Sequence, residues 1–145
     1  MLKAIAGFVA TLVVSTSFAA TAVTPNDLSG TYACTGNDSG DGNFQSTLTI
    51  TVDAKNSKPN QPFNTYRTKE STSELEKYSG EAISSSDGSM LSAYYSNNDP
   101  DQYKDEGVSS IVVTENAGKT TLQENYYEPD YSSGETGSEV CVKQG

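Results

Sequence analysis

Hydrophobic and polar residues alternate along much of this chain, a pattern typical of β-strands with one buried face. Between Phe44 and Asp53 the even positions are phenylalanine, serine, leucine, isoleucine and valine, whereas the odd positions are glutamine, threonine and aspartate. The segment Ser71–Lys77 reads equally well as one helical turn or as strand and loop, and no long stretch has a helical period. The pattern therefore predicts an all-β fold.

Turn-forming sequences separate further strand-like segments. An Asp-Gly pair at positions 87 and 88 and an Asn-Ala-Gly-Lys sequence at positions 116–119 are suited to tight hairpins, where positive φ angles are needed. The expected strands are Gly30–Thr35, Phe44–Asp53, Asn64–Thr72, Tyr78–Ser86, Ser89–Tyr95, Val108–Thr114, Thr120–Tyr127 and Glu139–Lys143. About eight short strands with turn-rich connections are typical of a sandwich or a barrel.

The first 22 residues have the features of a secretory signal peptide. Lys3 supplies a positive charge, Ala4–Val14 is apolar but too short to span a bilayer, and the small residues that follow suit cleavage before Ala20 or Val23. We expect residues 1–22 to be the signal peptide and residues 23–145 to form one domain. The expected location is secreted or periplasmic, with no membrane association after cleavage.

Two cysteines, Cys34 and Cys141, lie near opposite ends of the expected mature chain. A single pair of thiols in an oxidising compartment is expected to form a disulfide. Consecutive hairpins form a meander, whose first and last strands are neighbours only if the sheet closes on itself. The prediction is a small antiparallel up-and-down β-barrel of about eight strands, closed by a disulfide between the first and last strands.

The alternation around the second cysteine raises a difficulty. Cys141 lies between Val140 and Val142 and should face outward by that pattern, whereas Cys34 shares its parity with Tyr32. A bulge in one strand or a bond at the rim of the barrel would reconcile the two cysteines. The sequence leaves both arrangements open.

Two short segments lie near the ends of the expected mature chain, Leu28-Ser29-Gly30-Thr31-Tyr32-Ala33-Cys34 and Glu139-Val140-Cys141-Val142. Together with the alternating strand that follows the first segment, they resemble small secreted bacterial barrel proteins, among them the periplasmic lysozyme inhibitors. The first strand is also similar to that of calycins. The resemblance to these barrel proteins implies a Tyr-x-Cys on the first strand bonded to a cysteine at the end. The inhibitors' Ser-Gly-x-x-Tyr loop has no counterpart, because Tyr78-Ser79-Gly80 is not followed by a tyrosine at the required offset. No inhibitory residue is therefore assigned.

Charge and composition narrow the possible functions. The formal net charge is −10 and the chain has no histidine, which disfavours binding to nucleic acids or anionic membranes and excludes Ser-His and Cys-His pairs and histidine-ligated zinc. Pairs of carboxylates are the remaining catalytic chemistry, but nothing in the sequence brings two of them together. We therefore expect a non-enzymatic binding protein without a cofactor.

Tyrosine is the dominant aromatic residue, with nine copies and no tryptophan. The adjacent pairs Tyr94-Tyr95 and Tyr126-Tyr127 should place one ring on each face of a strand. Outward tyrosines among acids would suit recognition of a basic macromolecule, because tyrosine anchors contacts and the field steers the encounter. The residues of this predicted outer surface are Asp99, Asp101, Tyr103, Asp105, Glu106, Asp130 and Tyr131. The alternative is a calycin-like carrier of a small apolar ligand inside the barrel, lined by Phe44, Leu48, Ile50 and Val52.

The loop at positions 37–43 has oxygen-bearing side chains at alternating positions, Asn37, Ser39 and Asp41, as in part of an EF-hand calcium loop. The twelfth position from Asn37 is Leu48 instead of a glutamate, and a strand follows instead of a helix. Such residues are also typical of a hairpin turn. An ordinary hairpin is expected, with weak calcium binding as the alternative.

Overall fold

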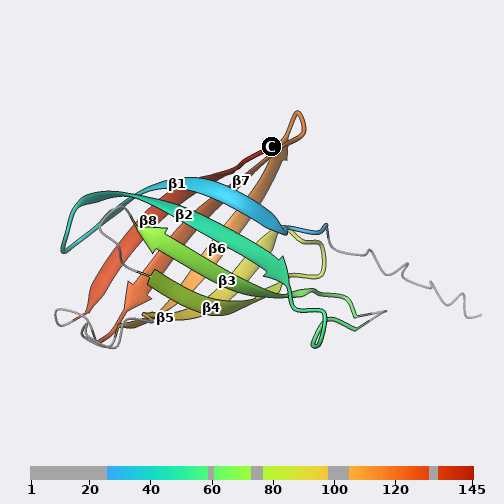
Figure 1. The fold of residues 1–145 in the computed structure, drawn as a ribbon, viewed down its shortest axis with the longest axis horizontal. Coiled ribbons are helices and arrows are strands. Elements are labelled where there is room, and N and C mark those ends of the chain that lie inside the picture. The colour runs from blue at the N-terminus through green and yellow to red at the C-terminus, as the bar shows by residue number, and fades with distance from the viewer. Residues whose placement is uncertain (1–25, 59–60, 73–76, 98–104, 131–133) are drawn as a thin grey trace, which may run out of the picture.

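A computed structural model describes residues 26–58, 61–72, 77–97, 105–130 and 134–145. In these ranges eight strands form one closed antiparallel barrel, in which each strand pairs with its neighbours in the sequence and β1 pairs with β8 (Figure 1). The strands are β1 (Gly30–Asp38), β2 (Asn43–Val52), β3 (Thr65–Thr72), β4 (Lys77–Ser84), β5 (Met90–Asn97), β6 (Glu106–Asn116), β7 (Lys119–Glu128) and β8 (Glu135–Lys143). The predicted all-β barrel is confirmed. Nowhere in the described ranges is there a helix long and apolar enough to cross a membrane.

The turns that shape the barrel form for local reasons. The Asp-Gly turn between β4 and β5 has Gly88 at φ 72°, and the Asp87 carboxylate accepts hydrogen bonds from the Ser85 and Ser89 hydroxyls. The turn between β6 and β7 places Ala117 and Gly118 at φ 50° and 77°, the left-handed conformations of a tight hairpin. These short connections fix the register of the strands that they join.

One half of the barrel interior is apolar. Its side chains pack together with almost no exposure, and they include Leu28, Tyr32, Leu48, Ile50, Tyr66, Leu91, Ile111 and Leu122. The segment before β1 covers this end of the barrel, because the Tyr32 hydroxyl donates to the Leu28 carbonyl at 2.7 Å and the Tyr66 hydroxyl donates to the Asn26 carbonyl at 3.2 Å. The buried tyrosine hydroxyls thus find partners in the backbone that they hold in place.

The disulfide lies inside the barrel, between residues that face each other across β1 and β8. Cys34 and Cys141 are 3% and 0% exposed, and their Cα atoms are 4.0 Å apart. The disulfide between the first and last strands is confirmed, but the expectation that Cys141 faces outward is wrong. Val140 is the outward residue, at 42% exposure. Hydrophobicity misassigned the face because the other inward positions of β8 are Glu135, Gly137 and Glu139, so its buried face is the more polar one.

A layer of aromatic rings crosses the interior beyond the disulfide. Each ring lies against a glycine directly opposite it on a neighbouring strand, in the pairs Phe44–Gly36, Tyr95–Gly107 and Tyr126–Gly137. A Cβ atom added to Gly137 would lie 2.1 Å from the Tyr126 ring, and the other two glycines are covered as closely. The missing side chains therefore allow three rings to fold down onto the sheet.

We expect Gly137→Ala to lower the free energy of unfolding by about 1 to 3 kcal/mol, because the added methyl group displaces the Tyr126 ring in a packed interior. Thermal unfolding measures the loss. Ser138→Ala, at the next and outward position, is the matched control and should unfold like the parent. In a Tyr126→Ala background the Gly137→Ala change should cost much less. Equal costs with and without the ring would contradict the proposed contact.

Candidate functional site

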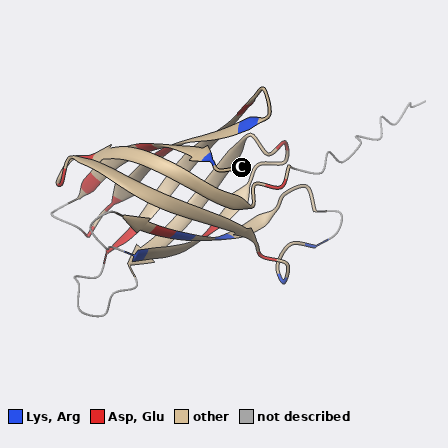
Figure 2. Ribbon diagram, turned by 45° about the horizontal axis from the view of Figure 1, so that its top comes forward, with Lys and Arg blue, Asp and Glu red and all other residues tan. Residues whose placement is uncertain are grey.

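The half of the interior opposite the apolar end contains a cavity of about 70 Å³. It lies where β1 turns into β2, the end of the barrel toward which acidic positions gather along the strands in Figure 2. Eight acidic residues line it, together with Asn43, Phe44, Thr72 and three tyrosines. None of the described lining residues is basic. The acidic residues are Asp38, Asp41, Glu70, Asp105, Glu124, Glu128, Glu135 and Glu139.

The carboxyl groups that face the interior occupy two levels. The inner level, next to the disulfide, consists of Glu70, Glu124 and Glu139. The outer level, near the strand ends, consists of Asp38, Asp105, Glu128 and Glu135. Period-two alternation produces both levels, because Glu124 and Glu128 share the inward parity of Leu122 on β7, and Glu135 and Glu139 share that of Cys141 on β8.

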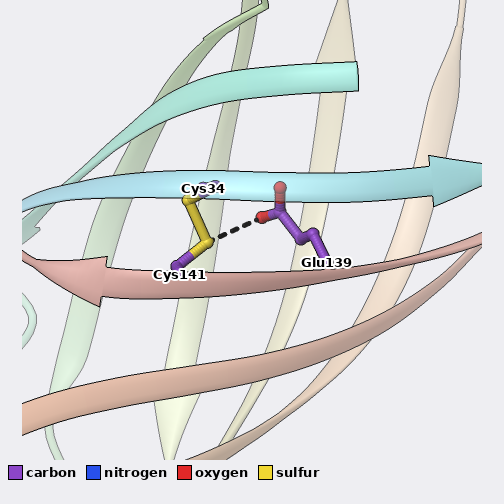
Figure 3. A group of neighbouring side chains, drawn as sticks. All are labelled: Cys34, Glu139 and Cys141. Carbon is purple, nitrogen blue, oxygen red and sulfur yellow. Dashed lines mark hydrogen bonds between the residues drawn. A yellow bond between two sulfur atoms is a disulfide. The ribbon is translucent and has the colours of Figure 1, made fainter. Parts of the chain in front are cut away.

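Burial raises the pKa of each inner carboxyl. The Ser46 hydroxyl donates to Glu139 Oε2 at 3.2 Å, and Glu139 Oε1 lies 3.1 Å from Cys141 Sγ (Figure 3). A disulfide sulfur carries no hydrogen, so a hydrogen bond at that contact requires the proton to be on Glu139. Burial, followed by the charges of Glu70 and Glu124, raises the pKa of Glu139 to about 10. Burial also raises the pKa of Glu124 to about 7 and that of Glu70 above its ordinary value.

Tyrosine hydroxyls support the outer carboxyls. The Tyr78 hydroxyl donates to Asp105 Oδ2 at 3.1 Å, and the Tyr95 hydroxyl donates to Glu128 Oε1 at 2.8 Å. Burial nevertheless raises the pKa of Glu128 to about 7, with the charges of Asp105 and Glu135 adding to the effect. Edge-to-face contacts link the ring of Tyr95 to those of Tyr78 and Tyr126, with centroids 5.7 Å and 6.3 Å apart. The rings and the outer acids therefore form one connected wall.

Several buried acceptors on this wall lack a donor. Asp105 and Glu135 are each 3% exposed, and Asp105 Oδ1, Glu135 Oε1 and Thr72 Oγ1 have no hydrogen-bond partner among the described residues. A buried acceptor without a donor costs about 1 to 3 kcal/mol, and more if it is charged. The described cavity wall thus has no positive charge and leaves these three buried oxygen atoms without a hydrogen-bond donor.

The carboxyls of the cavity do not converge on one point. In the described ranges, the one group of three or more potential metal ligands within 4.8 Å of one another is Cys34, Cys141 and Glu139, whose two sulfur atoms are bonded to each other. A bound metal ion requires several oxygen atoms around a single centre at 2.0 to 2.6 Å, roughly. The spread of the acids over the wall instead suits an organic ligand with some length.

The loop considered for calcium is organised as a hairpin. Asp38, which was not among the candidate ligands, accepts hydrogen bonds through Oδ1 from the backbone amides of Gly40 and Asp41 at 3.0 and 2.6 Å. Asn37 donates to the Asn43 side chain, and Ser39 Oγ accepts from the Thr136 amide. The side chains of Asn37 and Ser39 are thus both engaged in hydrogen bonds that hold the hairpin.

The predicted outer surface is only partly described, and one of its residues is placed differently. Asp105 is not on the outside, because it shares the inward parity of Gly107 and Ser109 on β6. Glu106 faces outward and accepts a hydrogen bond from the Tyr94 hydroxyl at 2.6 Å. Asp130 is exposed. Asp99, Asp101, Tyr103 and Tyr131 lie outside the described residues.

Comparison with protein-family models, curated proteins and solved structures finds no match to this chain. The resemblance to lysozyme inhibitors and calycins therefore stays a prediction. The chemistry of the cavity is the basis for the function considered next.

Proposed function

We propose that this protein is an exported, non-enzymatic binding protein that holds a small organic cation in the acidic half of its barrel. The observation that carries the proposal is the buried carboxylate oxygen Asp105 Oδ1, which lacks a donor in a cavity lined by eight acids and no described base. A protonated amine supplies the positive charge that this wall lacks and an N–H donor for the unpaired Asp105 oxygen.

The surroundings of the cavity strengthen its attraction for a cation. Interactions between charges are stronger in a partly enclosed space than in water, because the effective dielectric constant is lower. Tyr78, Tyr95 and Tyr126 add ring surfaces, against which an ammonium group is stabilised by about 0.5 to 2 kcal/mol. The same field repels carboxylates and phosphates, so anionic ligands are disfavoured.

The two earlier hypotheses remain predictions. The outer surface that was predicted to recognise a basic macromolecule does not include Asp105, because this residue faces the interior. Glu106 and Asp130 lie on the outside. Transport of an apolar ligand would need a cavity among apolar side chains, whereas the cavity of about 70 Å³ is lined mainly by acids and tyrosines. The acidic lining of the cavity favours a cation over an apolar molecule.

Butylamine should bind to the purified protein at pH 8 and raise its melting temperature in a saturable manner, because the folded state alone offers the cavity. Butanol and butyrate, which match its length without the positive charge, should not. Asp105→Asn should weaken butylamine about tenfold or more, the effect expected for losing a charge-assisted hydrogen bond. Isothermal titration calorimetry measures the affinities.

Glu106→Gln is the matched control, since it removes the same charge one residue further along, on the outward face. It should bind butylamine like the parent. If butylamine does not bind, or if Asp105→Asn and Glu106→Gln weaken it equally, the interior is not the cation site and the proposal is wrong.

A further inference from the structure

Along the barrel axis, the acidic half of the interior has a layer of aromatic rings between two layers of acidic side chains. On β7 the inward residues are Glu124, Tyr126 and Glu128 in that order, and on β8 the two acids Glu135 and Glu139 flank Gly137, which lies beneath the Tyr126 ring. The two acids on each strand are four positions apart. At roughly 3.3 Å per residue the acid positions are about 13 Å apart along the strand.

The ring level between the acids provides apolar contact. The hydroxyls of Tyr78 and Tyr95 are directed to Asp105 and Glu128 of the outer level, so these two tyrosines present their rings between the levels. Gly107 and Gly137 accommodate the rings of Tyr95 and Tyr126 against the sheet. Carboxyls at both ends and aromatic carbon between them match a molecule with two charged ends and an apolar middle.

The volume sets the size of that molecule. A cavity needs roughly 10 to 15 Å³ to hold one water molecule. A cavity of about 70 Å³ therefore has room for about five to seven non-hydrogen atoms. A chain of three to five carbons with a nitrogen at each end has that many. The lining includes acids of both levels, so such a chain would reach from one to the other.

We propose that the ligand is a linear aliphatic diamine of about three to five carbons, with one ammonium group among Glu70, Glu124 and Glu139 and the other beside Asp105 and Glu128. This inference rests on the proposed cation-binding function. The buried acceptors favour primary ammonium groups over quaternary ones, since only the former donate hydrogen bonds to Asp105 Oδ1 and Thr72 Oγ1.

Entry of the inner ammonium has a proton consequence. Burial, together with the charges of Glu70 and Glu124, raises the pKa of Glu139 to about 10 and so favours its protonated form when the cavity holds no cation. A hydrogen bond at its 3.1 Å contact with the disulfide sulfur would place that proton on Oε1 of Glu139. Its neighbours in the same space are Glu70, Glu124 and the Ser46 hydroxyl, and none of them is basic. An ammonium group that arrives there favours the ionised carboxylates, so a proton leaves to the solvent as the diamine binds. Binding should then strengthen as the pH rises to 8.

The test compares butane-1,4-diamine with butylamine, which has the same carbon chain and one ammonium group. Calorimetry at pH 7.5 in two buffers of different ionisation enthalpy measures affinity and proton release together. We expect the diamine to bind at least tenfold more tightly and to release more protons than butylamine, because only the diamine reaches Glu139, whose pKa is raised the most. Ethane-1,2-diamine and octane-1,8-diamine, too short and too long for the cavity, should bind more weakly than the four-carbon diamine.

Glu124→Gln and Glu139→Gln test the inner level, because each keeps the shape of the carboxyl group and removes its ability to ionise. Each should reduce the preference for the diamine over butylamine severalfold. Glu81→Gln, an exposed position on β4, should leave that preference unchanged. Magnesium at equal concentration controls for the double charge and should not displace the diamine.

The outcomes separate the two proposals. If butylamine and butane-1,4-diamine bind with equal affinity, the diamine inference is wrong and the cation-binding function stands. The same conclusion follows if magnesium displaces the diamine to the same extent as an equal concentration of butylamine. The inference is also wrong if Glu81→Gln reduces the preference for the diamine over butylamine as much as Glu124→Gln does. If neither amine binds, the proposed function itself fails.

Discussion

The free energy of unfolding should be greatest near pH 5 and fall by several kcal/mol when the pH is raised to 9. Glu124 and Glu139 have an ordinary pKa of 4.5, which burial in the barrel raises to about 7 and about 10. Between the ordinary pKa and the raised one, the folded chain binds more protons than the unfolded chain, so stability decreases as the pH rises. These groups therefore contribute fully below about pH 4.5. Their contribution decreases above that pH and is lost as the pH passes about 7 for Glu124 and about 10 for Glu139.

The size of the effect follows from the linkage between protons and folding. One pKa unit corresponds to about 1.4 kcal/mol, so even half of the shift at Glu139 amounts to about 3 to 4 kcal/mol. On the acid side, the hydroxyl and amide donors around Asp87 lower its pKa to about 2. The contribution of Asp87 is present above its ordinary pKa of 3.8 and is lost as the pH falls through 2. The optimum therefore lies between these two ranges.

Thermal or urea unfolding across pH 4 to 9, without added amines, measures the profile. Glu139→Gln should flatten it and should make the protein more stable than the parent at pH 9, because an amide cannot ionise. Glu81→Gln, an exposed glutamate on β4, is the control and should follow the profile of the parent. A parent protein that is as stable at pH 9 as at pH 5 would show that the inner carboxyls ionise without cost.

The double variant Cys34→Ala/Cys141→Ala should lose about 4 kcal/mol of stability and retain the barrel. The disulfide joins residues 107 positions apart, and in the chain-entropy model a closed loop of about 100 residues is worth about 4.7 kcal/mol, mostly through the unfolded state. For a chain of this size that loss lowers the melting temperature by roughly 10 to 20 °C. Strand pairing through β1 and β8 remains available without the bond.

Thr35→Ala/Val140→Ala is the matched control, since these residues form the next cross-strand pair and face outward. That variant should stay within a few degrees of the parent. Circular dichroism shows whether the strands persist in the alanine variant of the cysteines. If that variant melts within about 2 °C of the parent, the bond does not restrict the unfolded chain as described.

The sequence was informative about strands and much less so about the contents of the barrel. Turn residues such as Gly88 and Gly118 and the alternation in β2 predict the hairpins from local interactions alone. Closure of the barrel was predictable because one disulfide had to join the first and last strands of a meander. These features depend on neighbours in the sequence and on a single covalent link.

The site was missed because polarity was taken to indicate the outer face. Glu139 alternates with Val140, and the usual reading puts the valine inside, whereas the structure does the reverse. The signal that could have corrected this was Cys141, which must meet Cys34 within the barrel and therefore brings Glu139 inward with it. The acids of β7 and β8 line the same cavity as Glu70 of β3 only because the barrel is closed. No local sequence pattern encodes that closure.

The place of the disulfide also determines which molecules can reach it. Exchange begins when a thiolate anion approaches a sulfur atom along the bond axis. Here one sulfur is fully buried behind the inner carboxyls, and the apolar half of the barrel covers the other side. An anionic reductant approaching through the cavity is repelled by the acids, and the thiolate that must leave gains no positive neighbour to stabilise it. The arrangement that attracts amines therefore also shields the cross-link from small acidic thiols for as long as the barrel stays closed.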